Sequence, residues 1–480
     1  METAYSGQRI TVVGLARSGV GAANLLAHSG ASTTVTDLKK PEQLAPFIEA
    51  LDPAVSLALG GHPAGLLESS DLVVVSPGIP LDIEPLERAR LNGVKIIGEL
   101  ELAYQALRRN IGASAPEFLA VTGTNGKSTT TALLDEMLRS GGISTILGGN
   151  IGNSLAAEVL DLIVNPRAAA IKYVVSELSS FQLEAIESFR PKGAAILNIT
   201  PDHLDRYHEM GPYMSAKCRV SLNQSSIDYL VLNADDPYTP ELERIIGAHD
   251  QKPQIFYFSR KKEVEGAYLQ NGKIRFNLSA RRMSSISPDM AVPDASLALD
   301  PYAFVIKGVH NIENAMAAAL MAGLAGCSFS GIENALAAFP GLEHRLEMVR
   351  ELNGVKYIND SKGTNVGAVL KSLEGFAEPV ILIAGGRDKD SDFSLLRPLI
   401  KEKVKSLVLV GEAAGKIAKA VCDVTQCEMA GYDFRVAISK AKEAALPGDV
   451  VLLSPACASF DMFRDFEDRG RQFKQMVMEL

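Results

Sequence analysis

Short apolar runs alternate along this chain with longer stretches in which apolar residues recur every three or four positions. In the first quarter, apolar runs occupy residues 9–13, 32–36 and 71–76, and the stretch between the first two has the helical spacing. Buried parallel strands have the first pattern, and amphipathic helices have the second. The alternation therefore predicts an α/β fold that begins with a small, doubly wound, Rossmann-like domain.

The same alternation continues through the middle and last thirds of the chain. Helices are expected over residues 128–139, from Pro212 and from Val309, and the segment IGASAPE (residues 111–117) has the composition of a linker. The further expected strands are residues 118–122, 145–147, 173–176, 194–199, 356–358, 380–384, 406–410 and 450–454. We therefore predict three α/β domains: a Rossmann-like domain at 1–115, a central P-loop ATPase-like domain at 116–341, and a second Rossmann-like domain at 342–480.

The functional interpretation is centred on the segment FLAVTGTNGKSTT. After an apolar strand, glycines and small residues let backbone N–H groups surround phosphate oxygens, while Lys127 adds positive charge and Ser128 a hydroxyl suited to magnesium. Only two residues separate Gly123 from Gly126, so the full G-x-x-x-x-G-K-[ST] motif is absent, and a plain strand-to-helix turn is the alternative. The predicted nucleotide-binding loop comprises Gly123, Thr124, Asn125, Gly126, Lys127, Ser128 and Thr129.

Three later side chains are candidates for holding magnesium near the phosphates. Glu177 and His203 each follow an expected strand, where open α/β sheets place their ligands. Lys217 lies on the next expected helix; if its pKa is lowered beside metal ions, its neutral amine can add CO2 and become a carbamate, an oxygen ligand. The alternatives are a capping or solvated glutamate, a structural histidine and a solvated lysine.

The loop GLARSG, residues 14–19, resembles the first turn of a dinucleotide-binding unit. Ala16 stands where the second glycine of G-x-G-x-x-G would be, and Asp37 stands where an acid would contact a ribose. The alternative is a structural turn without a ligand. The rigid Ser76-Pro77-Gly78 turn ends the third expected strand at the same edge of the sheet.

Three asparagines stand at further positions that could contact a ligand. Asn150 lies in a glycine-rich turn, which permits close approach of a ligand. Asn311 and Asn314 share the polar face of the helix from Val309 and could contact a base, although helix capping also explains either one.

Composition and charge exclude several partners. The 480 residues carry a net charge of −9, so we expect no nucleic-acid or anionic-membrane partner. No leader peptide and no apolar run of about eighteen residues is seen, which favours a cytoplasmic protein. The five cysteines lack metal-ligand spacing, and we expect them to be ordinary core residues in a reducing compartment.

Four segments, in this order, resemble the Mur ligases, the ATP-dependent peptide-forming enzymes of bacterial cell-wall synthesis. They are TGTNGKST, SELSSFQLE, NITPDHLDRY with Lys217 fourteen residues after His203, and HNIENAMAA. The segments GLEHR, NDSKGTN, AGGRDK and LSPACASFD are similar to those of the D-glutamate-adding members. The resemblance covers nearly the whole chain, and SPACASFDMFRDFEDRG is its most discriminating segment.

The resemblance implies ligation of D-glutamate to UDP-N-acetylmuramoyl-L-alanine by a monomer, with ATP as co-substrate and Mg2+ at two sites, or Mn2+ in its place. It implies catalytic roles for Lys127, Glu177, His203 and Lys217, and a metal-ligand set of Ser128, Glu177, His203 and carbamylated Lys217. Beside the phosphate loop, the implied ATP contacts are Asn311, Arg345 and Asp360. The implied UDP-substrate contacts are Leu15, Ala16, Asp37, Ser76, Pro77, Gly78, Asn150 and His203, and those for D-glutamate are Lys362, Thr364, Lys389, Ser459 and Phe466. Ala16 and Arg17 stand where the family's front loop usually has a second glycine and a threonine.

Two other interpretations stay open. A related amide ligase acting on another substrate, such as the L-alanine-adding Mur ligase or a folylpolyglutamate synthase, should share the phosphate loop and lysine but not the SPACASFD segment. An ATP-binding regulatory protein would carry out no condensation, and the absence of an N-K-x-D signature disfavours its GTPase version.

Overall fold

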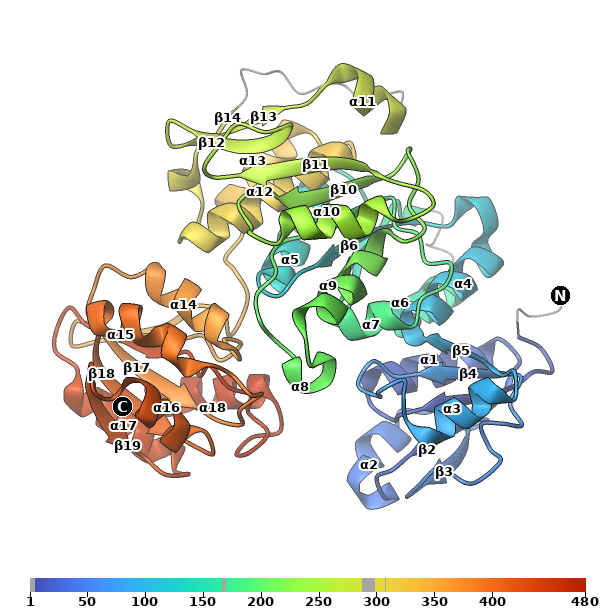
Figure 1. Cartoon of the computed structure of the whole chain (residues 1–480), viewed down its shortest axis with the longest axis horizontal. Coiled ribbons are helices and arrows are strands. Elements are labelled where there is room, and N and C mark those ends of the chain that lie inside the picture. The colour runs from blue at the N-terminus through green and yellow to red at the C-terminus, as the bar shows by residue number, and fades with distance from the viewer. Residues whose placement is uncertain (1–4, 166–169, 287–297, 307) are drawn as a thin grey trace.

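A computed structural model describes residues 5–165, 170–286, 298–306 and 308–480. Within these residues the strands form three separate sheets, of five, nine and six strands. Figure 1 shows them as three lobes: an N-terminal lobe (β1–β5, blue), a central lobe (β6–β14) and a C-terminal lobe (β15–β20, orange to red). The predicted three-part α/β fold is confirmed.

The N-terminal sheet is parallel, in the order β3-β2-β1-β4-β5. The strand order reverses at β1, which lies between β2 and β4, and open α/β sheets bind ligands beside the carboxyl ends of the strands at such a point. The elements of this lobe are β1 (Arg9–Val13), α1 (Arg17–His28), β2 (Ser32–Asp37), α2 (Pro41–Ile48), β3 (Ser56–Leu59), β4 (Leu72–Val75), α3 (Glu84–Leu91), β5 (Lys95–Gly98) and the connecting helix α4 (Glu99–Ile111).

The central sheet has the order β14-β13-β12-β11-β10-β9-β6-β8-β7 and is parallel except that β13 pairs antiparallel with β12 and β14. The phosphate loop follows β6, so the ends of β8 and β9 flank it on both sides. The strands are β6 (Glu117–Thr122), β7 (Thr145–Gly149), β8 (Tyr173–Glu177), β9 (Gly193–Ile196), β10 (Tyr229–Asn233), β11 (Gln254–Ser259), β12 (Gly266–Gln270), β13 (Lys273–Asn277) and β14 (Ala298–Leu299). The helices are α5 (Lys127–Ser140), α6 (Leu155–Val164), α7 (Ser180–Glu184), α8 (Leu204–Tyr207), α9 (Met210–Cys218), α10 (Thr239–Gly247), α11 (Ala280–Ile286), α12 (Val309–Leu324) and α13 (Phe329–Ala338).

The C-terminal sheet has the order β15-β16-β20-β17-β18-β19, with an antiparallel strand β15 at one edge. Its elements are β15 (Glu347–Leu352), β16 (Val355–Asn359), α14 (Val366–Glu374), β17 (Val380–Gly385), α15 (Arg397–Lys403), β18 (Val404–Val410), α16 (Ala414–Val421), β19 (Gln426–Met429), α17 (Phe434–Ala444), β20 (Val450–Leu453) and α18 (Phe466–Met478).

Apolar packing joins the first two lobes and leaves the third separate. One buried cluster runs from Ile10 of β1 through Leu155 of α6 to Leu230 of β10. Glu101 of α4 reinforces this junction, because its carboxylate accepts hydrogen bonds from the backbone N–H groups of residues 187, 188 and 189 at 2.9–3.0 Å. Among the described residues, no apolar cluster joins the C-terminal lobe to the other two. Polar contacts do join it to the central lobe, such as Arg345 with Ser128 and Asn365 with Asp202.

Four predicted boundaries are wrong by two or three residues: β7 continues to Gly149, β18 begins at Val404, and the other two concern β9 and α9. The strand expected over residues 194–199 ends at Ile196, because the next residues leave the sheet to support the phosphate loop: Asn198 O accepts from Thr124 N at 2.9 Å. The helix expected from Pro212 begins at Met210, with Glu209 in an extended conformation before it.

The cysteine expectation holds for three residues and is wrong for two. Cys218, Cys327 and Cys457 are buried and free. Cys422 and Cys427 are instead joined by a disulfide between the end of α16 and β19, because the turn between these elements brings the two residues together. Within the described parts of the chain, no helix combines the length and apolar character needed to cross a membrane.

Candidate active site

The phosphate loop connects β6 to α5 and is held by side chains from the neighbouring strand end. Asn198 accepts from Asn125 N at 2.8 Å and donates to Asn125 O at 3.0 Å. Gly126 has φ of +84°, and a Cβ there would lie 2.3 Å from Asn314 Oδ1, so this position requires glycine. The loop is therefore fixed by its surroundings: the N–H groups of Thr124 and Asn125 are used to hold it, and those at the N-terminus of α5 are left for an anion.

Two lysine amines meet at the same loop carbonyl. Lys127 Nζ donates to Gly123 O at 3.0 Å and to Thr124 O at 2.8 Å, and Lys217 Nζ of α9 donates to Gly123 O at 2.8 Å. Lys217 is buried, and its Nζ lies 4.6 Å from the centre of the Tyr213 ring. Burial, and then the charge of Lys127, lower the pKa of Lys217 well below its ordinary value. A solvated lysine on a helix face is therefore the wrong interpretation of this residue.

Glu177 is a buried carboxylate at the end of β8 with one unused oxygen. Its Oε1 accepts from Asn150 Nδ2 at 2.6 Å, while its Oε2 has no hydrogen-bond partner among the described residues. Burial alone would raise the pKa of Glu177, but Lys362 and Lys127 outweigh it and lower that pKa. The side chain is therefore ionised, and its free oxygen fits a divalent cation beside the phosphate loop.

Ser128, the other predicted ligand near Glu177, lies at the start of α5. It is fully buried, and its hydroxyl accepts from Arg345 Nη2 of the C-terminal lobe at 3.3 Å. This contact places the predicted nucleotide-binding residue Arg345 directly at the phosphate loop.

His203 precedes the short helix α8 with a left-handed backbone, φ +57°. Its ring centre lies 4.7 Å from that of Phe181, and burial lowers the pKa of His203 to about 4 against the opposing charge of Asp202. The imidazole is therefore neutral at pH 7 and has a lone pair for a metal or a substrate donor. Within the described chain no contact joins His203 to Glu177, although the charge of Glu177 raises the pKa of Lys127, and the charge of Lys127 lowers the pKa of His203.

Asp202 is a site residue that the sequence analysis missed. Although burial raises its pKa, nearby positive charges, above all Lys389, outweigh this effect and lower that pKa. Lys389 Nζ lies 3.6 Å from Asp202 Oδ1, and Asn365 donates to Asp202 Oδ2 at 3.1 Å. Asp202 therefore joins the C-terminal lobe to the segment after β9. An aspartate between Pro201 and His203 has the pattern of a turn residue, so no local signal distinguished it.

A cavity of about 370 Å³ lies between the central and C-terminal lobes, beside the phosphate loop. Every predicted nucleotide contact outside the loop lines it: Asn311, Arg345 and Asp360. Asp360 accepts from Ser372 Oγ at 2.7 Å and Ser454 Oγ at 2.6 Å. Asn314 lines the same cavity; it is buried and donates to Asn311 Oδ1 at 3.1 Å, so the two amides share one face of α12 as predicted.

A second cavity, of about 550 Å³, opens at the carboxyl ends of β1, β2 and β4. Seven of the eight predicted UDP-substrate residues line it, and His203 does not: the seven are Leu15, Ala16, Asp37, Ser76, Pro77, Gly78 and Asn150. Asp37 accepts from Leu15 N and Lys39 N at 2.7 and 2.8 Å, so it also fixes the two loops of the cavity. Further lining residues, which were not predicted from the sequence, include Arg17, Ser18, Lys39, His62 and Gln182.

The predicted D-glutamate residues come from three segments of the C-terminal lobe. Lys362 Nζ lies 4.8 Å from the centre of the Phe466 ring, and burial lowers the pKa of Lys362 to about 8. Thr364 follows in the same turn, where its N–H donates to Lys362 O at 2.8 Å. Ser459 is buried. The structure thus brings Lys362 to Phe466 and Lys389 to Asp202, and it records no side-chain contact that joins all five residues.

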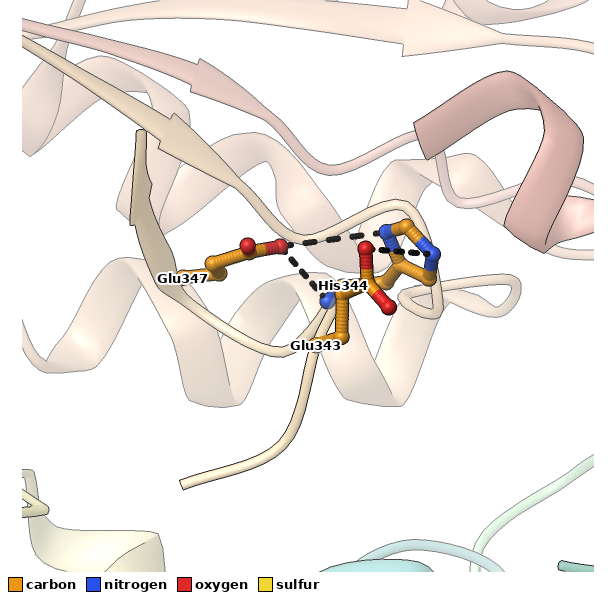
Figure 2. A group of neighbouring side chains, drawn as sticks. All are labelled: Glu343, His344 and Glu347. Carbon is orange, nitrogen blue, oxygen red and sulfur yellow. Dashed lines mark hydrogen bonds and ion pairs between the residues drawn. The ribbon is translucent and has the colours of Figure 1, made fainter. Parts of the chain in front are cut away.

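A separate histidine and two glutamates lie close together at the start of the C-terminal lobe. Figure 2 shows Glu343, His344 and Glu347, the one group of this kind among the described residues whose potential metal-binding atoms are all within 4.8 Å. Lys474 forms ion pairs with both glutamates, at 2.9 and 2.5 Å, and Asn359 Nδ2 lies 2.8 Å from His344 Nδ1. These partners already satisfy the group, so we interpret it as structural.

Comparison with known proteins shows which family the chain resembles. Family models match three parts of the chain: "Mur ligase MurD-like, N-terminal domain" at residues 8–98, "Mur ligase middle domain" at 121–322 and "Mur ligase, glutamate ligase domain" at 344–457. The chain is 43% identical to a protein of Pelotomaculum thermopropionicum (99% of this chain, 98% of that one) and 44% identical to one of Geotalea uraniireducens (98% of each). Both are named UDP-N-acetylmuramoylalanine–D-glutamate ligase.

Solved structures show the same fold at lower identity. The UDP-N-acetylmuramate-alanine ligase MurC of Thermotoga maritima matches with a TM-score of 0.59 at 20% identity, covering 98% of this chain and 99% of that one. MurF of Acinetobacter baumannii matches with a TM-score of 0.61 at 16% identity, covering 98% and 93%. The full-length relatives and the three family models together show that this chain belongs to the Mur ligase family, with an N-terminal domain of the MurD-like type.

Proposed function

We propose that this chain joins D-glutamate to UDP-N-acetylmuramoyl-L-alanine, converting ATP to ADP and phosphate, as a step of peptidoglycan precursor synthesis in the cytoplasm. The relatives that match over nearly the full length carry the corresponding name. One geometric observation supports the proposal most directly: Asn150 lines the N-terminal cavity while its amide is bonded to Glu177 beside the phosphate loop. A substrate in that cavity can therefore reach the nucleotide at Glu177.

The reaction requires activation because a carboxylate oxygen is a poor leaving group. ATP phosphorylates the substrate carboxylate to an acyl phosphate, and the amine of D-glutamate attacks its carbonyl carbon. The tetrahedral intermediate then expels phosphate and loses a proton, leaving the amide. Several anionic oxygens crowd together in this sequence, so Lys127 and the N–H groups at the start of α5 stabilise and position them. When bound, magnesium supplies further charge stabilisation there.

We assign Ser128 and Glu177 to one magnesium site, and His203 with a carbamylated Lys217 to a second; Mn2+ is an expected substitute. The orphaned buried Glu177 Oε2 and the neutral His203 ring both suit a cation. The low pKa of Lys217 supports the carbamate, because only an unprotonated amine can attack CO2, losing a proton as the N–C bond forms.

The remaining assignments follow the two cavities. We propose that the nucleotide occupies the 370 Å³ cavity against Asn311, Arg345 and Asp360, and that the uridine nucleotide occupies the 550 Å³ cavity. D-glutamate is assigned to Lys362, Thr364, Lys389, Ser459 and Phe466. We also propose a monomer with domains at 1–115, 116–341 and 342–480, since each sheet lies within one of these ranges.

One assay tests the function. Purified protein with ATP, Mg2+ and UDP-N-acetylmuramoyl-L-alanine should release phosphate when D-glutamate is added, and much less with L-glutamate or L-alanine. Activity with L-alanine and the unsubstituted UDP-N-acetylmuramate would instead assign another step of the pathway. Phosphate release that is independent of every amino acid would refute ligase activity.

A further inference from the structure

His62 lies at the edge of the 550 Å³ cavity, in the turn that follows β3. The turn is tied to the end of β2, because Gly60 N and Gly61 N both donate to Asp37 O, at 3.0 and 3.1 Å. The imidazole lines the cavity together with Asp37 and Lys39. The backbone therefore fixes His62 at the edge of the sheet where α/β folds bind their ligands.

The hydrogen bonds of Thr36 determine which nitrogen of the His62 ring carries the proton. Thr36 Oγ1 lies 3.1 Å from Gly61 O and 3.0 Å from His62 Nδ1. A carbonyl oxygen can only accept, so the single hydroxyl proton of Thr36 is donated to Gly61 O. Oγ1 must then accept from the ring, which assigns the proton to Nδ1 and leaves a lone pair on Nε2.

The surroundings of His62 keep this lone pair available. Burial lowers the pKa of His62, against the charge of Asp37 at the end of β2, and the cations Arg17 of α1 and Lys39 also line the cavity. The ring is therefore neutral at pH 7. Among the described residues, no hydrogen-bond partner is recorded for Nε2. A fixed acceptor of this kind at a cavity wall matches a ligand that presents an N–H or O–H donor.

We propose that His62 is a positioning residue for the uridine part of the substrate, with Nε2 accepting a hydrogen bond from the base N–H or a ribose hydroxyl. The inference rests on the proposed function, which supplies a uridine nucleotide as the ligand of this cavity. Uracil has one such donor, at N3, and the ribose has two, at O2′ and O3′. Thr36 acts indirectly, because it holds the ring in the tautomer that can accept.

Two conservative variants separate this role from a structural one. In His62→Asn the amide nitrogen can still donate to Thr36, but the acceptor in the cavity is lost. In His62→Gln the amide oxygen can reach the position of Nε2, but the contact with Thr36 is lost. We expect the KM for UDP-N-acetylmuramoyl-L-alanine to rise about threefold to tenfold in His62→Asn and to stay near wild type in His62→Gln, with the KM for ATP and D-glutamate unchanged in both. If the hydrogen bond with Thr36 is the only role of His62, this KM should be higher in His62→Gln than in His62→Asn, and the proposal is wrong.

Nucleotide analogues identify the donor. UDP, 3-methyl-UDP, 2′-deoxy-UDP and 3′-deoxy-UDP are compared as competitive inhibitors of the wild type and of His62→Asn. The analogue that lacks the relevant donor should bind the wild type about threefold to tenfold more weakly than UDP does. It should bind His62→Asn as tightly as UDP binds that variant. If every analogue is weakened equally in both proteins, His62 does not contact uridine. A wild type without D-glutamate-dependent phosphate release would refute the proposed function, whereas an active wild type with unaffected His62 variants would refute this inference alone.

Discussion

Replacing Gly126 by alanine tests whether the packing of the phosphate loop controls nucleotide binding. Gly126 has φ of +84°, a conformation that costs an alanine roughly 1–2 kcal/mol. The added Cβ would also lie 2.3 Å from Asn314 Oδ1, below the 3.0 Å that real contacts respect, so the loop or Asn314 must move by about 0.7 Å. Overpacking of this kind costs a further 1–3 kcal/mol or so. We therefore expect a destabilisation of about 2–5 kcal/mol.

Gly142 provides the matched control. It has φ of +78° just after α5, and a Cβ there would meet no atom within 4 Å. Gly142→Ala should therefore show the conformational cost alone, about 1–2 kcal/mol, and leave the KM for ATP unchanged.

Calorimetry and steady-state kinetics measure the two effects. Gly126→Ala should lower the Tm of the central lobe more than Gly142→Ala does, and raise the KM for ATP about tenfold or more, because the loop N–H groups are displaced. In an Asn314→Ala background, Gly126→Ala should lower the stability only by the cost of the alanine backbone conformation, without the cost of overpacking. Equal losses at Gly126 and Gly142, or an unchanged KM in Gly126→Ala, would refute the reasoning.

Three further predictions concern the charged groups of the site. Lys217→Ala should lose about a hundredfold or more in kcat, and added short carboxylates or bicarbonate should restore more activity to it than to the wild type; wild-type rates in this variant would exclude the carbamate role. Because burial lowers the pKa of Lys362 to about 8, its ammonium is present below that pH and lost above it. The KM for D-glutamate should therefore rise as the pH passes 8, and a pH profile unchanged in Lys362→Arg would contradict this. Asn365→Asp places a second carboxylate at the 3.1 Å contact with Asp202 and should raise the KM for ATP and D-glutamate about tenfold. Asn365→Ser should have a smaller effect on both KM values. Solution scattering should show less ligand-dependent compaction in the aspartate variant.

The sequence was sufficient to predict the fold and the position of the phosphate loop between strand and helix, because both depend on local patterns. Apolar runs of four to six residues mark the strands, and ligand residues follow strand ends, so Glu177 and Asn150 could be located before their contact was known. The family resemblance supplied the residues of the C-terminal lobe, such as Arg345, whose contact with Ser128 spans 217 positions.

The rest could not be predicted, because it depends on contacts between distant segments. Asp202 and Asn365 lie in two segments of the family resemblance, but they are separated by 163 positions, and nothing in either segment indicates that the two side chains pair. The pairing of Cys422 with Cys427 depends on how the turn between α16 and β19 folds, whereas the sequence led us to expect ordinary core cysteines in a reducing compartment. The role of Asp37 in holding the N–H groups of Leu15 and Lys39 likewise required the three-dimensional arrangement of two loops.

The unequal apolar packing of the three lobes has a consequence for how the chain could be divided. A cut before β15 would leave both interiors intact, since the residues on either side bury their own side chains. A cut after α4 would expose the apolar cluster that includes Ile10 and Leu230. It would also remove the three backbone N–H groups that donate to the Glu101 carboxylate. The protein therefore consists of two separately packed parts: the first two lobes, with Asn150 and Glu177 in contact, and the C-terminal lobe, which bears Lys362.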